Sequence, residues 1–204
     1  MIHRRILQLG AVVGVVGALA GCQVLKTPPP VQTYRFGLPA ELPAVGDNPS
    51  TTTVAIRRIE FPTASGSDRI LGVTGTETAY IGGARWVSPA ATLFDESLKA
   101  AFATRADRIR VLDRREPGAS PLVLQVSIST FEARYSAPGA APDVVISARS
   151  LLRSTQGQGR TIERVFTVTQ PAAENRVSAI VDAFDVATRD INTQIADWTI
   201  QSAK

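Results

Sequence analysis

The clearest pattern of apolar positions lies near the C-terminus, where they recur every three or four residues. The stripe consists of Val177, Ile180, Val181, Phe184, Ala187, Thr188, Ile191, Ile195 and Trp198. The charged residues of the same segment lie mostly away from the stripe, and they are Arg176, Asp182, Asp185, Arg189, Asp190 and Asp197. This spacing predicts an amphipathic helix. At about 24 residues the helix would be roughly 36 Å long and would lie across one face of a sheet.

Three segments before this helix show the pattern of neighbouring strands. Apolar Leu122, Leu124, Val126 and Ile128 alternate with Val123, Gln125, Ser127 and Ser129, which is typical of a strand with one buried face. Extended segments follow at residues 144–152 and 161–169, separated by Gly157-Gln158-Gly159. We therefore expect long antiparallel neighbours.

The first half of the chain predicts shorter elements. Extended segments are expected at residues 34–38, 52–61, 70–73, 76–81 and 109–112. Gly82-Gly83 is interpreted as a two-residue hairpin turn that returns the chain through residues 84–86.

A second helix is predicted after this turn. Ser88 would be its N-cap and Pro89 its first residue. Its apolar positions at helical spacing are Leu93, Phe94, Leu98, Ala101 and Phe102. The whole pattern predicts one α+β domain, with an antiparallel or mixed sheet and two main helices packed on it.

The N-terminus has the layout of an export signal. His3, Arg4 and Arg5 precede an apolar run at residues 6–18, which is too short for a comfortable membrane span. Leu19-Ala20-Gly21-Cys22 then resembles the lipobox of bacterial lipoproteins. The resemblance implies cleavage before Cys22 and attachment of diacylglycerol to its thiol, and two or three acyl chains would anchor the protein stably.

The expected organisation is therefore a signal peptide at residues 1–21, a lipidated cysteine and Pro-rich tether at residues 22–33, and a domain at residues 34–204. Gln23 follows the cysteine where many Gram-negative lipoproteins retained in the inner membrane have Asp. This difference favours the outer membrane, with the domain facing the periplasm.

Composition narrows the chemistry of the expected domain. The chain has one histidine, His3, and one cysteine, Cys22. Without other imidazoles or thiols, the domain has no Ser/His or Cys/His pair and few means to hold zinc, so we expect neither catalytic residues nor a metal. No cofactor is expected apart from the covalent lipid. The pairs Asp95-Glu96 and Asp182/Asp185 are interpreted as structural or solubilising, with the second pair on a solvated helix face.

The charge balance excludes a nucleic-acid partner. Removing Arg4 and Arg5 with the signal lowers Lys plus Arg from 22 to 20 against 18 acidic residues, which leaves a net charge of +2. Nucleic-acid binding needs a concentrated basic patch, which the sequence lacks.

The order of features resembles one known family. The shared features are the lipobox, a tether with Thr27-Pro28-Pro29-Pro30, the segment Tyr34-Arg35-Phe36-Gly37-Leu38, a strand from Val54 towards Pro62, Ala84-Arg85-Trp86-Val87-Ser88-Pro89 before a helix, and a long C-terminal helix. Together they resemble the ABC-type transport auxiliary lipoproteins, which include the paraquat-inducible protein C type. The resemblance implies a non-catalytic component of a lipid transport system between two membranes. Its implied partners are an ABC ATPase, a permease and a periplasmic protein with a mammalian-cell-entry domain.

The sequence does not decide which residues contact a partner protein. Tyr80, Ile81 and Trp86 are candidate contacts for a partner, although Trp86 also fits a core residue that packs on the following helix. The family usually has a Tyr-rich stretch here, whereas Tyr80 is followed by Ile81-Gly82-Gly83. Strand edges could also join copies of the chain into a homo-oligomer.

Two other functions remain possible. One is a structural or assembly lipoprotein, such as a pilot or envelope-assembly subunit, without a transport role. The other is a soluble lipid carrier, which would need an apolar cavity of several hundred Å³.

Overall fold

The computed structural model describes residues 30–37, 52–112, 120–156 and 159–203. The chain divides into two units, Met1–Pro30 and Val31–Lys204, and the fold described below is that of the second unit. Cys22 and the first part of the tether lie outside the described residues.

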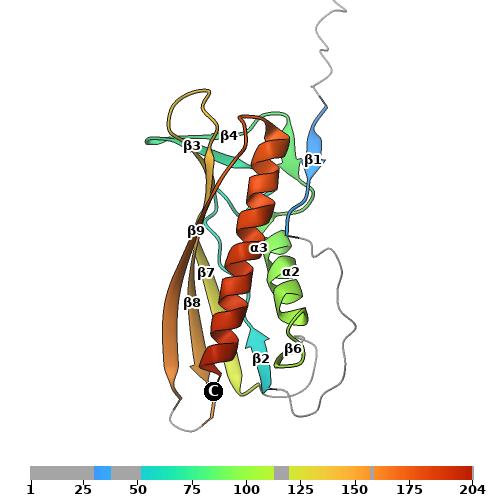
Figure 1. Cartoon of the computed structure of the whole chain (residues 1–204), viewed down its shortest axis with the longest axis vertical. Coiled ribbons are helices and arrows are strands. Elements are labelled where there is room, and N and C mark those ends of the chain that lie inside the picture. The colour runs from blue at the N-terminus through green and yellow to red at the C-terminus, as the bar shows by residue number, and fades with distance from the viewer. Residues whose placement is uncertain (1–29, 38–51, 113–119, 157–158, 204) are drawn as a thin grey trace, which may run out of the picture. The chain divides into compact units, whose positions relative to one another are not determined.

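Three long strands form the main part of the sheet (Figure 1). They are β7 (Leu122–Tyr135), β8 (Asp143–Ser154) and β9 (Thr161–Pro171). β8 pairs antiparallel with both neighbours, as the alternating pattern predicted. A register shift between Ile128 and Thr130 marks a bulge in β7, which increases the local twist.

The other edge of β7 is divided between two strands. Its start pairs in parallel with β2 (Thr52–Ile56), and β2 pairs in parallel with β6 (Ile109–Leu112). Its end pairs in parallel with β3 (Leu71–Thr74), and β3 pairs antiparallel with β4 (Glu77–Tyr80). The sheet is therefore mixed, and the predicted α+β class is confirmed.

The predicted hairpin through Gly82-Gly83 is wrong. β4 returns along β3 through Gly75-Thr76, where Gly75 has a φ of +59°. After Gly82-Gly83 the chain enters β5 (Ala84–Trp86), which pairs in parallel with β1 (Gln32–Tyr34) as a separate two-stranded sheet. Residues 82–83 do form a turn, but β5, the strand that follows it, pairs with β1, which is distant in the sequence.

Two other predicted strands have different bounds. β1 ends at Tyr34, and Phe36 and Gly37 are buried after it instead of continuing the strand. β2 ends at Ile56, and the following segment touches β7 again at a single bridge between Glu60 and Ser127. The Arg57 N–H still donates to the Leu124 carbonyl of β7, so the gap between these two contacts begins at Arg58.

The described residues form two helices, α2 (Ala90–Ala103) and α3 (Val177–Ser202). α3 packs on β8 and β9, and α2 lies beside α3 (Figure 1). Every member of the predicted α3 stripe is buried except Val177, which is half-buried. The prediction of Ser88 as N-cap is wrong, because Pro89 precedes the helix and no side chain caps it. Instead, the N–H groups of Ala90 and Ala91 donate to the carbonyls of Ser67 and Gly66.

Aromatic rings fill the core between α3 and the sheet. The Trp86 ring lies edge-on to those of Phe36 and Phe184, at centroid distances of 4.8 and 5.3 Å. Phe131 of β7 contacts Phe184 at 4.9 Å. These rings join β5, β7 and α3. The two Trp86 contacts are edge-to-face, whereas the Phe131 and Phe184 rings are tilted at 37° to each other.

Candidate functional site

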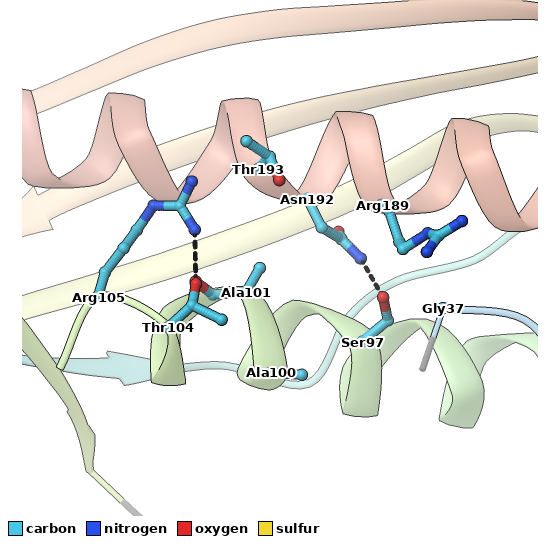
Figure 2. Close-up of a pocket in the computed structure, with 9 residues that line it drawn as sticks. All are labelled: Gly37, Ser97, Ala100, Ala101, Thr104, Arg105, Arg189, Asn192 and Thr193. Carbon is cyan, nitrogen blue, oxygen red and sulfur yellow. Dashed lines mark hydrogen bonds between the residues drawn. The ribbon is translucent and has the colours of Figure 1, made fainter. Parts of the chain in front are cut away.

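The surface between α2 and α3 contains a buried polar pair. Ser97 of α2 is 5% exposed and Asn192 of α3 is fully buried. The Asn192 Nδ2 donates a hydrogen bond of 3.0 Å to the Ser97 Oγ (Figure 2). The Asn192 Oδ1 has no partner among the described residues. Leaving a buried acceptor unsatisfied costs about 1–3 kcal/mol, so this polar pair lowers the stability of the contact between α2 and α3.

Gly37 brings the N-terminal segment into the same place. We call residues 32–37 the strap, because they run from β1 to the two helices. The Gly37 N–H donates to the Asp185 Oδ1 at 2.7 Å. Its φ is +73°, and a Cβ there would lie 2.5 Å from the Ser97 Oγ. Only glycine fits this approach without strain.

Two arginine–carboxylate pairs lie along the line where α2 and α3 meet, which we call the seam. Arg105 donates from Nε and Nη2 to the two oxygens of Asp197, at 2.6 and 3.1 Å. This hydrogen-bonded guanidinium holds the pKa of the Asp197 carboxyl below its usual value. Arg189 pairs with Asp185 one turn away on α3. Asp185 therefore binds both Arg189 and the strap, which is a structural role, as expected, although its side chain is half-buried and not on a fully solvated face.

A cavity of about 130 Å³ opens between these groups (Figure 2). Its lining comes from both helices and the strap, and consists of Gly37, Ser97, Ala100, Ala101, Thr104, Arg105, Arg189, Asn192 and Thr193. We call it the interhelical pocket. It combines two alanine methyl groups with hydroxyl, amide and guanidinium groups, so it suits a small polar ligand.

A larger hollow lies between residues 58–63 and the start of α2. Its volume is about 480 Å³, and Arg58 and Glu60 line it together with Ile59, Phe61 and Pro62. The charged lining distinguishes it from the apolar cavity that the lipid-carrier hypothesis requires.

The three predicted contact residues have different surroundings. Trp86 is 2% exposed and packs in the aromatic core, so its side chain is not available to a partner in this structure. The Tyr80 hydroxyl donates to the Ala64 carbonyl, and the Arg69 guanidinium lies 3.6 Å from the centroid of the Tyr80 ring. Ile81 is half-buried against the core. Tyr80 and Ile81 stay predictions, each with part of its surface exposed.

The interhelical pocket was missed at the level of sequence. Its local signal is a polar residue beside an apolar stripe: Asn192 follows Ile191, and Ser97 precedes Leu98. No local signal pairs them, because 95 positions separate the two residues.

Among the described residues, no helix combines the length and the apolar character that crossing a bilayer requires. The same part of the chain contains no cluster of three or more His, Cys, Asp or Glu side chains placed to hold a metal ion.

Comparisons with known proteins give a family and a fold. The family model described as the ABC-type transport auxiliary lipoprotein component matches residues 36–196. The crystal structure of protein XCC0632 from Xanthomonas campestris superposes with a TM-score of 0.66 at 24% identity, over 86% of this chain and 94% of that one. A second crystal structure, of an uncharacterized protein, has a TM-score of 0.64 at 19% identity, over 83% and 98% of the two chains. No curated protein matches the sequence.

Proposed function

Because the chain belongs to the ABC-type transport auxiliary lipoprotein family, we propose that it is a non-catalytic, lipid-anchored component of an ABC-type lipid transport system. The observation that carries this proposal is the family match, which runs from the strap to the last turns of α3. The family name places the protein in the cell envelope and associates it with an ABC transport system. The lipid cargo, the outer membrane and the individual partners are parts of the proposal.

The way the strap joins the domain supports an anchoring role. The Gln32 N–H donates to the Gly83 carbonyl, and the Tyr34 carbonyl accepts from the Val87 N–H, both at 2.8 Å. Phe36 is buried among the core aromatic rings, and Gly37 is held by Asp185. A pull on the tether from lipid at Cys22 would therefore reach the core directly.

The proposed partners are the ATPase, the permease and a periplasmic protein with a mammalian-cell-entry domain. ATP hydrolysis belongs to the ATPase, because this sequence has no nucleotide-binding loop. In the proposal, Tyr80 and Ile81 contribute contacts to the periplasmic partner. The free edge of β9 is a second candidate surface: among the described strands β9 pairs only with β8, and Val165 on it is 59% exposed.

Affinity capture from membranes tests the proposal. The tagged full-length chain would be solubilised in mild detergent and its partners identified by mass spectrometry. We expect the ATPase, the permease and the cell-entry domain protein to co-purify. A Cys22→Ser variant, which cannot carry the thioether-linked lipid, is the matched control and should recover fewer membrane-bound partners.

Two results would count against a transport role. Recovery of no transporter subunit would contradict it. Recovery of envelope-assembly subunits alone would favour the alternative of a structural or assembly lipoprotein.

A further inference from the structure

We propose that the free edge of β9 binds an extended, acidic segment of a partner protein, which adds to the sheet as a further strand. The inference deepens the proposed function and rests on it for the premise that this chain has a protein partner. Its own evidence is the backbone of β9 and the arginine side chains beside it. In strand addition, main-chain hydrogen bonds provide affinity and side chains at alternate positions provide specificity.

The register of β8 and β9 shows which backbone groups of β9 face the free edge. The Ala172 N–H donates to the Pro142 carbonyl, and the Ser154 N–H donates to the Arg160 carbonyl, both at 2.9 Å. In an antiparallel ladder every second pair of residues exchanges hydrogen bonds, so the even-numbered residues of β9 bond to β8. No other described strand pairs with β9. The backbone groups that face the free edge are therefore those of Thr161, Glu163, Val165, Thr167 and Thr169.

Two exposed arginines lie along this edge, and neither has an acidic partner among the described residues. Arg160 and Arg164 are four positions apart, which places them on one face of the extended chain, the face that packs on α3. The Arg164 guanidinium lies 5.2 Å from the centroid of the Phe166 ring on the same face. Glu163 pairs with Arg149 on the opposite face. A strand added at this edge would thus meet unpaired positive charge on one face, which favours carboxylates at alternate positions.

Charge also favours this occupant over a second copy of the chain. Residues 144–173 contain four arginines and one acidic residue, so two β9 edges brought together would repel each other. An inward-pointing charge on an edge strand opposes pairing with apolar strands, whereas a strand with carboxylates on that face would be attracted. On the other face, Val165 is 59% exposed and offers a contact for a β-branched side chain of the same strand.

Fluorescence anisotropy of a labelled peptide, in which Glu alternates with Val and both ends are blocked, tests the charge selection. We expect it to bind the full-length chain in neutral detergent, and to bind at least about fivefold more weakly when Gln replaces each Glu. Arg164→Glu should also weaken binding of the acidic peptide at least about fivefold, because an attraction becomes a repulsion. Arg153→Glu is the matched control. It changes the net charge equally but lies on the opposite face of β8, so its binding should stay within about twofold of the wild type.

A proline substitution separates strand addition from a general attraction between charges. The Val165 N–H faces the free edge, so Val165→Pro removes no hydrogen bond to β8 and should fold, which a thermal melt checks. It should weaken peptide binding at least about tenfold, because the incoming strand loses a donor and meets the proline ring. Val165→Thr keeps the N–H and should bind as the wild type does. A peptide N-methylated at alternate residues keeps its charges but loses its donors, and it should also bind weakly.

Each alternative gives a different result. Absence of binding by the wild type, equal binding of the Glu and Gln peptides, or unchanged binding by folded Val165→Pro and by the N-methylated peptide would overturn the proposal. Sedimentation of the full-length chain in the same detergent tests the second copy: an assembly that Val165→Pro dissociates would replace the acidic partner by another β9 edge. No transporter subunit takes part in these titrations, so a failure here leaves the affinity capture untouched, and a failed capture leaves the peptide binding unchanged.

Discussion

Helix α3 packs against two surfaces of opposite chemistry. Towards the sheet, Phe184 is fully buried and meets the rings of Trp86 and Phe131. Towards α2, the contact includes Ser97 and Asn192 with a cavity beside them, and the buried Thr188 Oγ1 and Asn192 Oδ1 have no partner among the described residues. Apolar packing stabilises a fold, whereas unsatisfied buried polar groups oppose it. The sheet also has a buried atom without a partner in the described residues, the Ser150 Oγ of β8. The seam differs in having a cavity beside its polar groups, so we expect the sheet side of α3 to contribute more to stability.

The largest expected effect tests the sheet side. Phe184→Ala should lower the free energy of unfolding by about 3–5 kcal/mol, through lost transfer energy and a cavity among the rings. Urea unfolding measures this change. The exposed Val186→Ala on the same helix should stay within about 0.5 kcal/mol of the wild type. A loss below about 1 kcal/mol for Phe184→Ala would mean that the aromatic core is not the stabilising surface.

Gly37→Ala should have the next largest effect, because it acts where the strap enters the seam. The left-handed φ costs about 1–2 kcal/mol for a residue with a Cβ, and the close approach to Ser97 adds to it. We expect a loss of about 2 kcal/mol or more in urea unfolding. Gly82→Ala is the control, since its Cβ would meet no atom within 4 Å. Equal losses for the two variants would show that the strap is not held as described.

The Arg105–Asp197 pair should contribute less. The Asp197 side chain is 42% exposed, so Asp197→Asn should cost only about 0.2–1 kcal/mol at neutral pH. The Arg105 guanidinium lowers the pKa of the Asp197 carboxyl in the folded state. The contribution of the pair to stability is therefore complete above the ordinary pKa of 3.8. It is lost as the pH falls through the lowered pKa. Unfolding measured from pH 7 to pH 2 should therefore show the two proteins converging in acid, and a constant difference would exclude this cause.

The smallest effect is expected in the middle of the seam. Asn192→Leu removes an amide that is only half satisfied and places apolar atoms beside the cavity. Its free energy of unfolding should stay within about 1 kcal/mol of the wild type, or rise. A loss comparable to that of Phe184→Ala in the same urea series would show that the seam is a structural core, and the contrast between the two surfaces would disappear.

Local periodicity predicted the parts of the fold that depend on neighbours in sequence. The stripe around Phe184 and the alternation from Leu122 to Ile128 each identify a buried face, and both are confirmed. The partner of β5 could not be predicted, because β1 lies about 50 residues earlier and Gly82-Gly83 has the composition of a hairpin turn. β5 pairs with β1 because this pairing goes with the burial of Trp86 against Phe36 and Phe184.

The candidate site was less predictable than the fold. Asn192 and Ser97 each look like a tolerated polar residue beside an apolar stripe. They pair only because α2 and α3 lie side by side in the fold. Position 37 needs glycine because the strap passes close to Ser97 of α2. Resemblance to a family supplied the broad function, but it assigned no role to these residues.

The mass of the N-terminal peptide tests the central claim most directly. The protein would be extracted from membranes with detergent, digested and analysed by mass spectrometry. A lipid-anchored envelope component should begin at Cys22 and carry a diacylglyceryl group on its sulfur. A mature protein that retains Met1, or a Cys22 without acyl mass, would contradict the anchor and with it the proposed place in the envelope.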